Sequence, residues 1–187
     1  MTSTTNASLN SAGLEPERSK ALEERQAQQH EQPIIKAIKE LYSCKPKDTT
    51  FDIYAKDAVF HDPIGIANGV GSIRSQFFGL AKIFSRSDIP KFRILQNPST
   101  VAPNTILIDQ DVAYFLDAKS SSPTKVVNSL LTLKFDDTNK VVSHNEEWDH
   151  KKTTTNEDGF LGLVNEKRKK LTAGITDMFV GGGENKS

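Results

Sequence analysis

The apolar residues of this chain recur mainly at helical spacing in its first half and in β-rich segments in its second half, and this order limits the fold more than any other feature. They recur at helical spacing from Pro33 to Tyr42 and again from Ile73 to Phe84. Four β-rich segments follow, separated by short polar turns, and cover residues 91–96, 105–117, 125–135 and 141–150. Helices followed by a meander predict an α+β domain, with helices packed on one face of a strongly bent antiparallel sheet. The concave side of such a sheet can hold a pocket.

Three helices are expected before the meander. The middle helix is short, over residues 51–54, and leads through a turn into a strand at residues 58–60, which Pro63 and Gly65 end. Gly69 precedes the third helix. After the meander, residues 160–180 predict an amphipathic helix. Its apolar side consists of Phe160, Val164, Leu171, Ile175, Met178 and Phe179.

We expect the two ends of the chain to lie outside the hydrophobic core. Residues 1–31 contain almost no large apolar side chains, so we expect a disordered polar N-terminal extension. The folded domain is expected over residues 32–180, with a flexible tail at 181–187. This length fits one domain with one core.

The composition excludes several classes of protein. Lys plus Arg equals Asp plus Glu at 24 each, which argues against nucleic-acid binding. The single cysteine, Cys44, cannot form an internal disulfide, no Cys/His zinc spacing occurs, and no apolar run approaches the length needed to cross a membrane. We therefore expect a cytoplasmic protein that binds no membrane. The basic run at residues 167–170 fits either a solvated helix face or a nuclear-import signal.

The stretch Tyr-Ala-Lys-Asp-Ala-Val-Phe-His-Asp-Pro-Ile-Gly at residues 54–65 resembles the helix-to-first-strand signature of the NTF2-like superfamily. The last hairpin, residues 133–148, resembles that of the same superfamily, which includes SnoaL-like cyclases and ketosteroid isomerases. The resemblance covers about four-fifths of the chain in element order. It implies a cone-shaped fold, a small hydrophobic ligand and a homodimer, but the fold hosts unrelated activities.

The resemblance to ketosteroid isomerases implies a catalytic role for Asp62, which falls on the position of their proton-shuttling base. A carboxylate in an apolar cavity has a raised pKa and can exchange a carbon-bound proton near neutral pH. The two hydrogen-bond donors that assist this base fall on Ile38 and Leu131, which cannot donate. Tyr42 lies one helical turn beyond Ile38 and could replace one donor only if the helix register shifts. The alternative role for Asp62 is to brace the turn at Pro63.

Further ligand-binding candidates lie on the first and last strands. Strand alternation places His144, Glu146, Trp148 and His150 on one face of the last strand. If that face lines the cone, the first three can bind a ligand; otherwise it is exposed or faces a dimer partner. A metal site at His144, Glu146 and His150 lacks a second cluster, so we expect no metal. Tyr54 and His61 complete the candidates, with a packing role as the alternative for Tyr54.

Two functions remain open. The first is a binder of a small hydrophobic molecule, or a cofactor-independent isomerase, cyclase or dehydratase with Asp62 as base. The second is a non-catalytic dimerisation or interaction module that uses the outer face of the sheet. It requires a cone filled by side chains and an apolar outer face, whereas the first requires a deep, partly apolar pocket with Asp62 and Trp148 on its wall. No phosphate loop or nucleophile elbow occurs, so no cofactor is expected. The faces of Asp109, Asp111, Asn128 and Thr132 depend on bulges that the sequence does not reveal.

Overall fold

The computed structural model describes residues 8–153 and 159–180. The chain divides into a sheet domain up to Thr154 and a C-terminal unit that contains α4 (Gly159–Val180). The helical elements of the sheet domain are α1 (Pro16–Lys20), the 3-10 helix η1 (Gln29–Glu31), α2 (Gln32–Tyr42), the 3-10 helix η2 (Asp48–Ile53) and α3 (Val70–Ile83). Its strands are β1 (Tyr54–Asp62), β2 (Gly65–Asn68), β3 (Arg86–Leu95), β4 (Thr105–Phe115), β5 (Lys125–Phe135) and β6 (Val141–Trp148).

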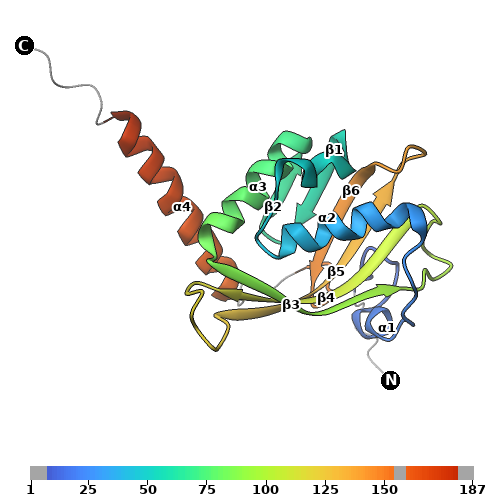
Figure 1. The fold of residues 1–187 in the computed structure, drawn as a ribbon. Helices are drawn as coiled ribbons and strands as arrows, with labels where there is room; N and C mark the ends of the chain where they lie inside the picture. The colour runs from blue at the N-terminus through green and yellow to red at the C-terminus, as the bar shows by residue number, and fades with distance from the viewer. Residues whose placement is uncertain (1–7, 154–158, 181–187) are drawn as a thin grey trace, which may run out of the picture. The chain divides into compact units, whose positions relative to one another are not determined.

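The six strands form one curved sheet in the order β2-β1-β6-β5-β4-β3 (Figure 1). Strands β3 to β6 form the expected antiparallel meander. The whole sheet, however, is mixed and not antiparallel as predicted, because β1 and β6 are parallel neighbours. The cause is α3, which carries the chain from the β1–β2 hairpin to the opposite edge of the sheet. The meander then returns to β1 from that far edge.

Helices α2 and α3 lie on the concave side of the sheet (Figure 1). The α2 helix buries the apolar residues that its spacing predicts, Ile34, Ile35, Ile38, Leu41 and Tyr42. In α3 the Phe77 ring lies 5.1 Å from the Phe60 ring of β1. Gly69 is the N-cap residue before α3 and has a φ of 80°, a conformation that favours glycine; its N–H donates to the Ala58 carbonyl. The main core therefore lies between these two helices and the sheet.

Several element boundaries differ from the predicted ones. The middle helix is the 3-10 turn η2, and β1 starts directly after it at Tyr54. The hairpin to β2 was not predicted. Strand β3 begins at Arg86 and contains Pro90, with a register shift between Asp88 and Lys91. Proline cannot donate to a β-ladder, and β3 tolerates it because β3 is an edge strand.

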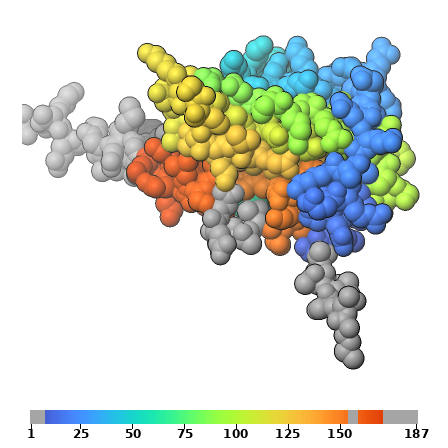
Figure 2. All heavy atoms as spheres, turned by 90° about the horizontal axis from the view of Figure 1, so that it is seen from below, coloured from blue at the N-terminus to red at the C-terminus, as the bar shows by residue number. Residues whose placement is uncertain are grey.

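The structure differs from the expectation of disorder for residues 8–31. Residues 8–28, called the N-terminal segment below, pack against the convex side of the sheet, and Figure 2 shows them in dark blue over one end of that face. Residues 23–25 extend the sheet beyond β3, since the Arg25 N–H donates to the Ile94 carbonyl at 2.7 Å. The small apolar cluster beneath the segment consists of Ala12, Leu95, Leu107 and Leu130, with Leu22 and Val101 packed against it.

Charged groups fix the end of the N-terminal segment. The Arg25 guanidinium donates two hydrogen bonds of 2.7 Å to the carboxylate of Glu31, whose side chain is only 2 % exposed. Burial raises the pKa of Glu31, but Arg25 and the Gln28 N–H lower it, and the net pKa is below its ordinary value. The polar groups of the segment thus have hydrogen-bond and ion-pair partners in the fold. Its polar composition therefore predicted disorder wrongly. Residues 1–7 and 181–187 lie outside the described part.

Amide hydrogen exchange tests this order directly. The amides of Arg25 and Ser11 are expected to exchange at least about 100-fold more slowly than in an unstructured peptide, because both are bonded to groups of the sheet domain. The exposed turn at residues 118–123 serves as the internal control and is expected to exchange quickly. Unprotected amides throughout residues 8–28 would restore the disorder interpretation.

The C-terminal unit is a helix with a mostly exposed basic face. Phe160 and Val164 are buried, while the remaining apolar residues of the predicted stripe lie outside the side chains that the structure describes. In the basic run, Lys170 pairs with Glu166 one turn earlier at 2.7 Å, as on a solvated helix face. No helix in residues 8–153 and 159–180 is both long and apolar enough to span a membrane.

Candidate functional site

Alternation along β6 brings three of the predicted site residues to the concave face. His144, Glu146 and Trp148 share one face, as alternation predicts, and all three are buried there, which the sequence had left open. Glu147 faces the convex side and binds Ser11. The register of β6 against β5 and β1 places these side chains beneath α2. The α2 helix contributes Tyr42, which helical spacing placed on the buried face but which was considered as a hydrogen-bond donor only for a shifted helix register. The helical spacing of apolar residues in α2 alone predicts that Tyr42 is buried.

These side chains form one directional chain of hydrogen bonds. The Tyr54 hydroxyl lies 2.8 Å from Nδ1 of His144, and the Tyr42 hydroxyl lies 3.2 Å from Nε2 of the same ring. Tyr42 donates to Oε2 of Glu146 at 2.8 Å, and Nε1 of Trp148 donates to Oε1 at 3.2 Å. An ionised carboxylate only accepts, so His144 must carry its proton on Nε2, donate to Tyr42 and accept from Tyr54. This series of hydrogen bonds therefore runs from Tyr54 through His144 and Tyr42 and ends on Glu146.

Burial controls the protonation of this cluster. It lowers the pKa of His144 to about 3, so the ring is neutral at ordinary pH. It raises the pKa of Glu146 to about 7, assisted by the negative charge of Asp62 and opposed by hydrogen bonds from Tyr42 and Trp148. Burial, with Glu146 next to it, also raises the pKa of Tyr42 well above its ordinary value. Glu146 is thus the group in this cluster poised to exchange a proton near neutral pH.

Asp62 is held firmly in the turn that follows β1. Its Oδ1 accepts from the backbone N–H groups of Ile64 and Gly65, both at 2.9 Å, and its Oδ2 accepts from Nε2 of Gln76 at 2.8 Å. Asp62 is buried, at 7 % exposure. These bonds brace the turn, as the alternative role predicted. The carboxylate also acts on the cluster, because its charge raises the pKa of Glu146.

Two of the predicted residues lie elsewhere. His61 is exposed, on the opposite side of β1 from Asp62, and joins no cluster. The prediction that His150 shares the face of His144 is wrong. Asp149 and His150 both have positive φ angles, 54° and 59°, which end the alternation and turn His150 to the convex side. There its ring is fully buried and lies 2.7 Å from Ser19 Oγ.

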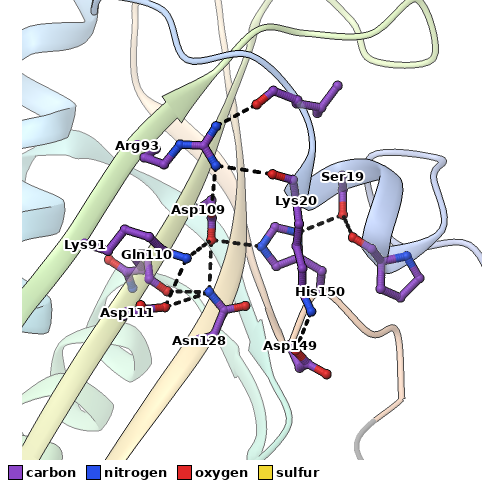
Figure 3. Close-up of polar contacts among 12 residues, drawn as sticks. Ser19, Lys20, Lys91, Arg93, Asp109, Gln110, Asp111, Asn128, Asp149 and His150 are labelled. Atoms are coloured by element: carbon purple, nitrogen blue, oxygen red, sulfur yellow. Dashed lines mark hydrogen bonds and ion pairs between the residues drawn. The ribbon is translucent and has the colours of Figure 1, made fainter.

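The convex side carries a second polar cluster, centred on Asp109 (Figure 3). Its carboxylate, 2 % exposed, accepts from Arg93, Asn128 and Nε2 of His150 at 3.0–3.1 Å and pairs with Lys91 at 3.1 Å. Burial raises its pKa, but His150 first, then Asn128 and Lys91, lower it, and the net pKa lies far below its ordinary value. The faces of Asp109, Asp111, Asn128 and Thr132, open in the sequence, are thereby settled as convex.

The line of Ser19, His150 and Asp109 has the residue types of a nucleophilic triad. Ser19 is fully buried, however, and its hydroxyl also donates to the Pro16 carbonyl and accepts from Asn10 Nδ2. A nucleophile needs an accessible oxygen. These contacts instead attach the N-terminal segment to the sheet, together with a 2.6 Å ion pair between Lys20 and Asp149.

Metal coordination finds no support in the described part of the chain, where no three His, Cys, Asp or Glu side chains group as ligands. His144 uses both ring nitrogens in hydrogen bonds to tyrosines, so it has no free lone pair for a metal.

Comparison with solved structures identifies the architecture. A steroid delta-isomerase from Pseudomonas aeruginosa matches with a TM-score of 0.54 at 9% identity, over 82% of this chain and 98% of that one. An NTF2-like protein from Anabaena variabilis matches with 0.53 at 13% identity, over 66% and 93%. A de novo designed protein with a curved β-sheet matches with 0.51 at 10% identity, over 76% and 97%. No protein-family model and no curated protein sequence matches this chain. At these identities the likeness is one of fold alone.

Proposed function

Because the chain has the NTF2-like fold with a polar cluster inside its cone, we propose that it binds a small, largely apolar molecule there and transfers a proton on it. One observation carries the proposal. Glu146 is a buried carboxyl with a pKa of about 7, hydrogen-bonded to Tyr42 and Trp148 and within the electrostatic influence of a second carboxylate, Asp62. The activity class that fits is a cofactor-independent isomerase, cyclase or dehydratase.

The chemistry assigns a role to each group. Ionised Glu146 takes a proton from a carbon next to a carbonyl, and the electron pair of that C–H bond moves onto the carbonyl oxygen as an enolate. Protonated Glu146 then returns the proton to the same or another atom of the ligand. Burial raises the pKa of Glu146 to near neutrality, and the negative charge of Asp62, which already accepts three hydrogen bonds, adds to that rise. Tyr42 remains protonated because its pKa is raised. Its hydroxyl donates to Glu146 while that carboxyl is ionised, and can donate to the developing negative charge on the ligand once Glu146 holds the abstracted proton.

The alternative function, an interaction module that uses the outer sheet face, requires that face to be open. The N-terminal segment covers its apolar cluster of Leu95, Leu107 and Leu130 in the described part of the chain. The exposed apolar side chains that remain on the β-strands, Ile66, Val126 and Val142, are single residues on three different strands. These observations favour the ligand-binding function.

Hydrogen–deuterium exchange at carbon tests the proposed function. Cyclohexanone, 2-cyclohexenone and 1-tetralone are incubated with the protein in D2O, and loss of the C–H signals next to the carbonyl is followed by NMR. Wild type is expected to accelerate exchange of at least one probe by about 100-fold or more, and Glu146→Gln to abolish the effect. Asp62→Asn should retain exchange, with its pH profile moved to lower pH because the pKa of Glu146 falls.

The same two variants show which of the two carboxyls transfers the proton. Exchange that survives Glu146→Gln but not Asp62→Asn would make Asp62 the proton carrier, in agreement with the expectation from the sequence. Equal exchange with and without wild-type protein would contradict proton transfer on carbon.

A further inference from the structure

One polar side chain on the concave face is satisfied by no other part of the protein that the structure describes. Gln110 of β4 is fully buried, and both its Nε2 and its Oε1 lack a hydrogen-bond partner. Buried amides are paired in most proteins, because an unpaired one loses its hydrogen bonds to water and gains none in return. Apolar residues of similar volume would fill this position with less cost. The amide therefore requires an explanation outside the fold itself.

The pairing of the strands places Gln110 in the cone. It lies opposite Ser129 of β5, and Ser129 lies opposite Trp148 of β6. Side chains of directly paired residues share a face, so the three form a row across the concave side. The Ser129 hydroxyl is also fully buried; it lies close enough to Glu146 to oppose the rise of that residue's pKa, yet lacks hydrogen-bond geometry. The next residues along, Asp109 and Asn128, face the convex side.

We propose that Gln110, with Ser129 beside it, is the polar recognition point of the cone and binds a neutral cis-amide, such as a primary amide or a lactam. The inference rests on the proposed function, since it names the polar group of the ligand. One edge of a carboxamide presents a donor and an acceptor side by side, and a group that presents the same two on one edge forms two hydrogen bonds with it. Primary amides and lactams carry N–H and C=O on one edge and meet this requirement.

Charge argues against the other group of that shape, a carboxylic acid. The cone already contains Asp62 and Glu146, which interact strongly enough for Asp62 to raise the pKa of Glu146. A ligand carboxylate would add a third negative charge in a poorly solvated space. A neutral amide avoids that repulsion, and its apolar body can lie against Trp148.

Three probes of similar size separate the contributions: benzamide, which donates and accepts; acetophenone, which only accepts; and ethylbenzene, which does neither. Trp148 is the only tryptophan of the chain and lies in the same row, so its fluorescence reports binding. Wild type is expected to bind benzamide about tenfold or more tightly than ethylbenzene, with acetophenone between them. Gln110→Leu should lose at least about tenfold in benzamide affinity and less than about twofold for ethylbenzene.

Stability provides a second readout. Gln110→Leu is expected to have a melting temperature equal to or above that of wild type, because it removes an unpaired amide from the interior. Thr105→Val is the matched control: Thr105 also has a buried hydroxyl without a partner, but on the convex face of the same strand. It should be equally stable and bind all three probes like wild type. If Gln110→Leu does not fold, Gln110→Met, which is unbranched like glutamine, takes its place.

The binding experiments can succeed or fail independently of the deuterium-exchange test of the proposed function. Selective loss of benzamide in a stable Gln110 variant supports the inference even if no probe exchanges deuterium. Wild-type protein that binds none of the three probes, or binds all three equally, would overturn it. So would a Gln110→Leu variant that folds but still prefers benzamide, because the amide would then have no recognition role.

Discussion

Glu146→Gln is expected to raise the free energy of unfolding by about 3 kcal/mol at about pH 8 and to change it little below about pH 4. The carboxyl has a pKa of about 7 in the folded protein and an ordinary value of 4.5 when unfolded. Between these values the folded state holds a proton that the unfolded state has released. Wild-type stability therefore falls as the pH rises through this window, by about 1.4 kcal/mol per pH unit. Glutamine does not titrate, so the variant lacks that loss.

Urea unfolding of wild type and variant across this pH range measures the effect. Glu147→Gln is the matched control, since Glu147 is the next residue on the strand but faces the convex side, where the Ser11 N–H donates to both carboxylate oxygens. That variant should be no more stable than wild type at any pH. A Glu146→Gln protein with the same pH dependence as wild type would show that Glu146 has an ordinary pKa, and the proposed proton transfer would lose its basis.

Asp109→Ala is expected to lower the free energy of unfolding by about 3–5 kcal/mol, the cost of removing one partner from a buried charge cluster. The substitution leaves the Arg93 guanidinium and the buried His150 without their shared acceptor. It should also release the N-terminal segment, because Arg93 donates to the carbonyls of Lys20 and Leu22 in the same arrangement. Thermal unfolding and amide exchange of residues 8–28 measure the two consequences.

Asp111→Ala is the control for this second prediction. Asp111 lies two residues away on the same face, but its side chain is 29% exposed, and its loss should cost less than about 1 kcal/mol. Because the folded-state pKa of Asp109 is lowered, its contribution is complete above about pH 4, the ordinary value, and is lost as the pH falls further. Equal effects of the two substitutions would contradict the central position of Asp109.

Patterns of apolar spacing predicted much of this fold. They gave the α+β class, the antiparallel meander and the buried face of α2, because each depends on residues close together in the sequence. Alternation likewise brought His144, Glu146 and Trp148 to one face. The parallel pairing of β1 with β6 was missed because it depends on where α3 delivers the chain, which no local pattern records.

The N-terminal segment escaped prediction for a different reason. Its order rests on polar contacts with residues far away in the sequence, such as Ser11 with Glu147 and Asn10 with the His150 carbonyl. Composition identifies such a segment as disordered, because it counts apolar residues and cannot see polar partners. The misplacement of His150 has an equally local cause, two positive φ angles that interrupt alternation just after β6.

The buried Gln110 amide shows how function can be sought in a fold that hosts many activities. Sequence analysis could place it on a strand but not on a face, and burial without a partner appears only in three dimensions. Residues that reduce stability and form no hydrogen bond within the protein are expected at functional sites. Gln110, Ser129 and Glu146 together make the concave face more polar than packing requires.

The most direct test of a ligand site at Glu146 is a carboxyl carbon NMR titration from about pH 4 to about pH 9, with and without benzamide, using Glu146→Gln to assign the signal. We expect a midpoint near 7 that moves when the probe binds, since a molecule against Glu146 changes its solvation. A midpoint at the ordinary value of 4.5, unchanged by the probe, would contradict both the buried proton carrier and the small-molecule site.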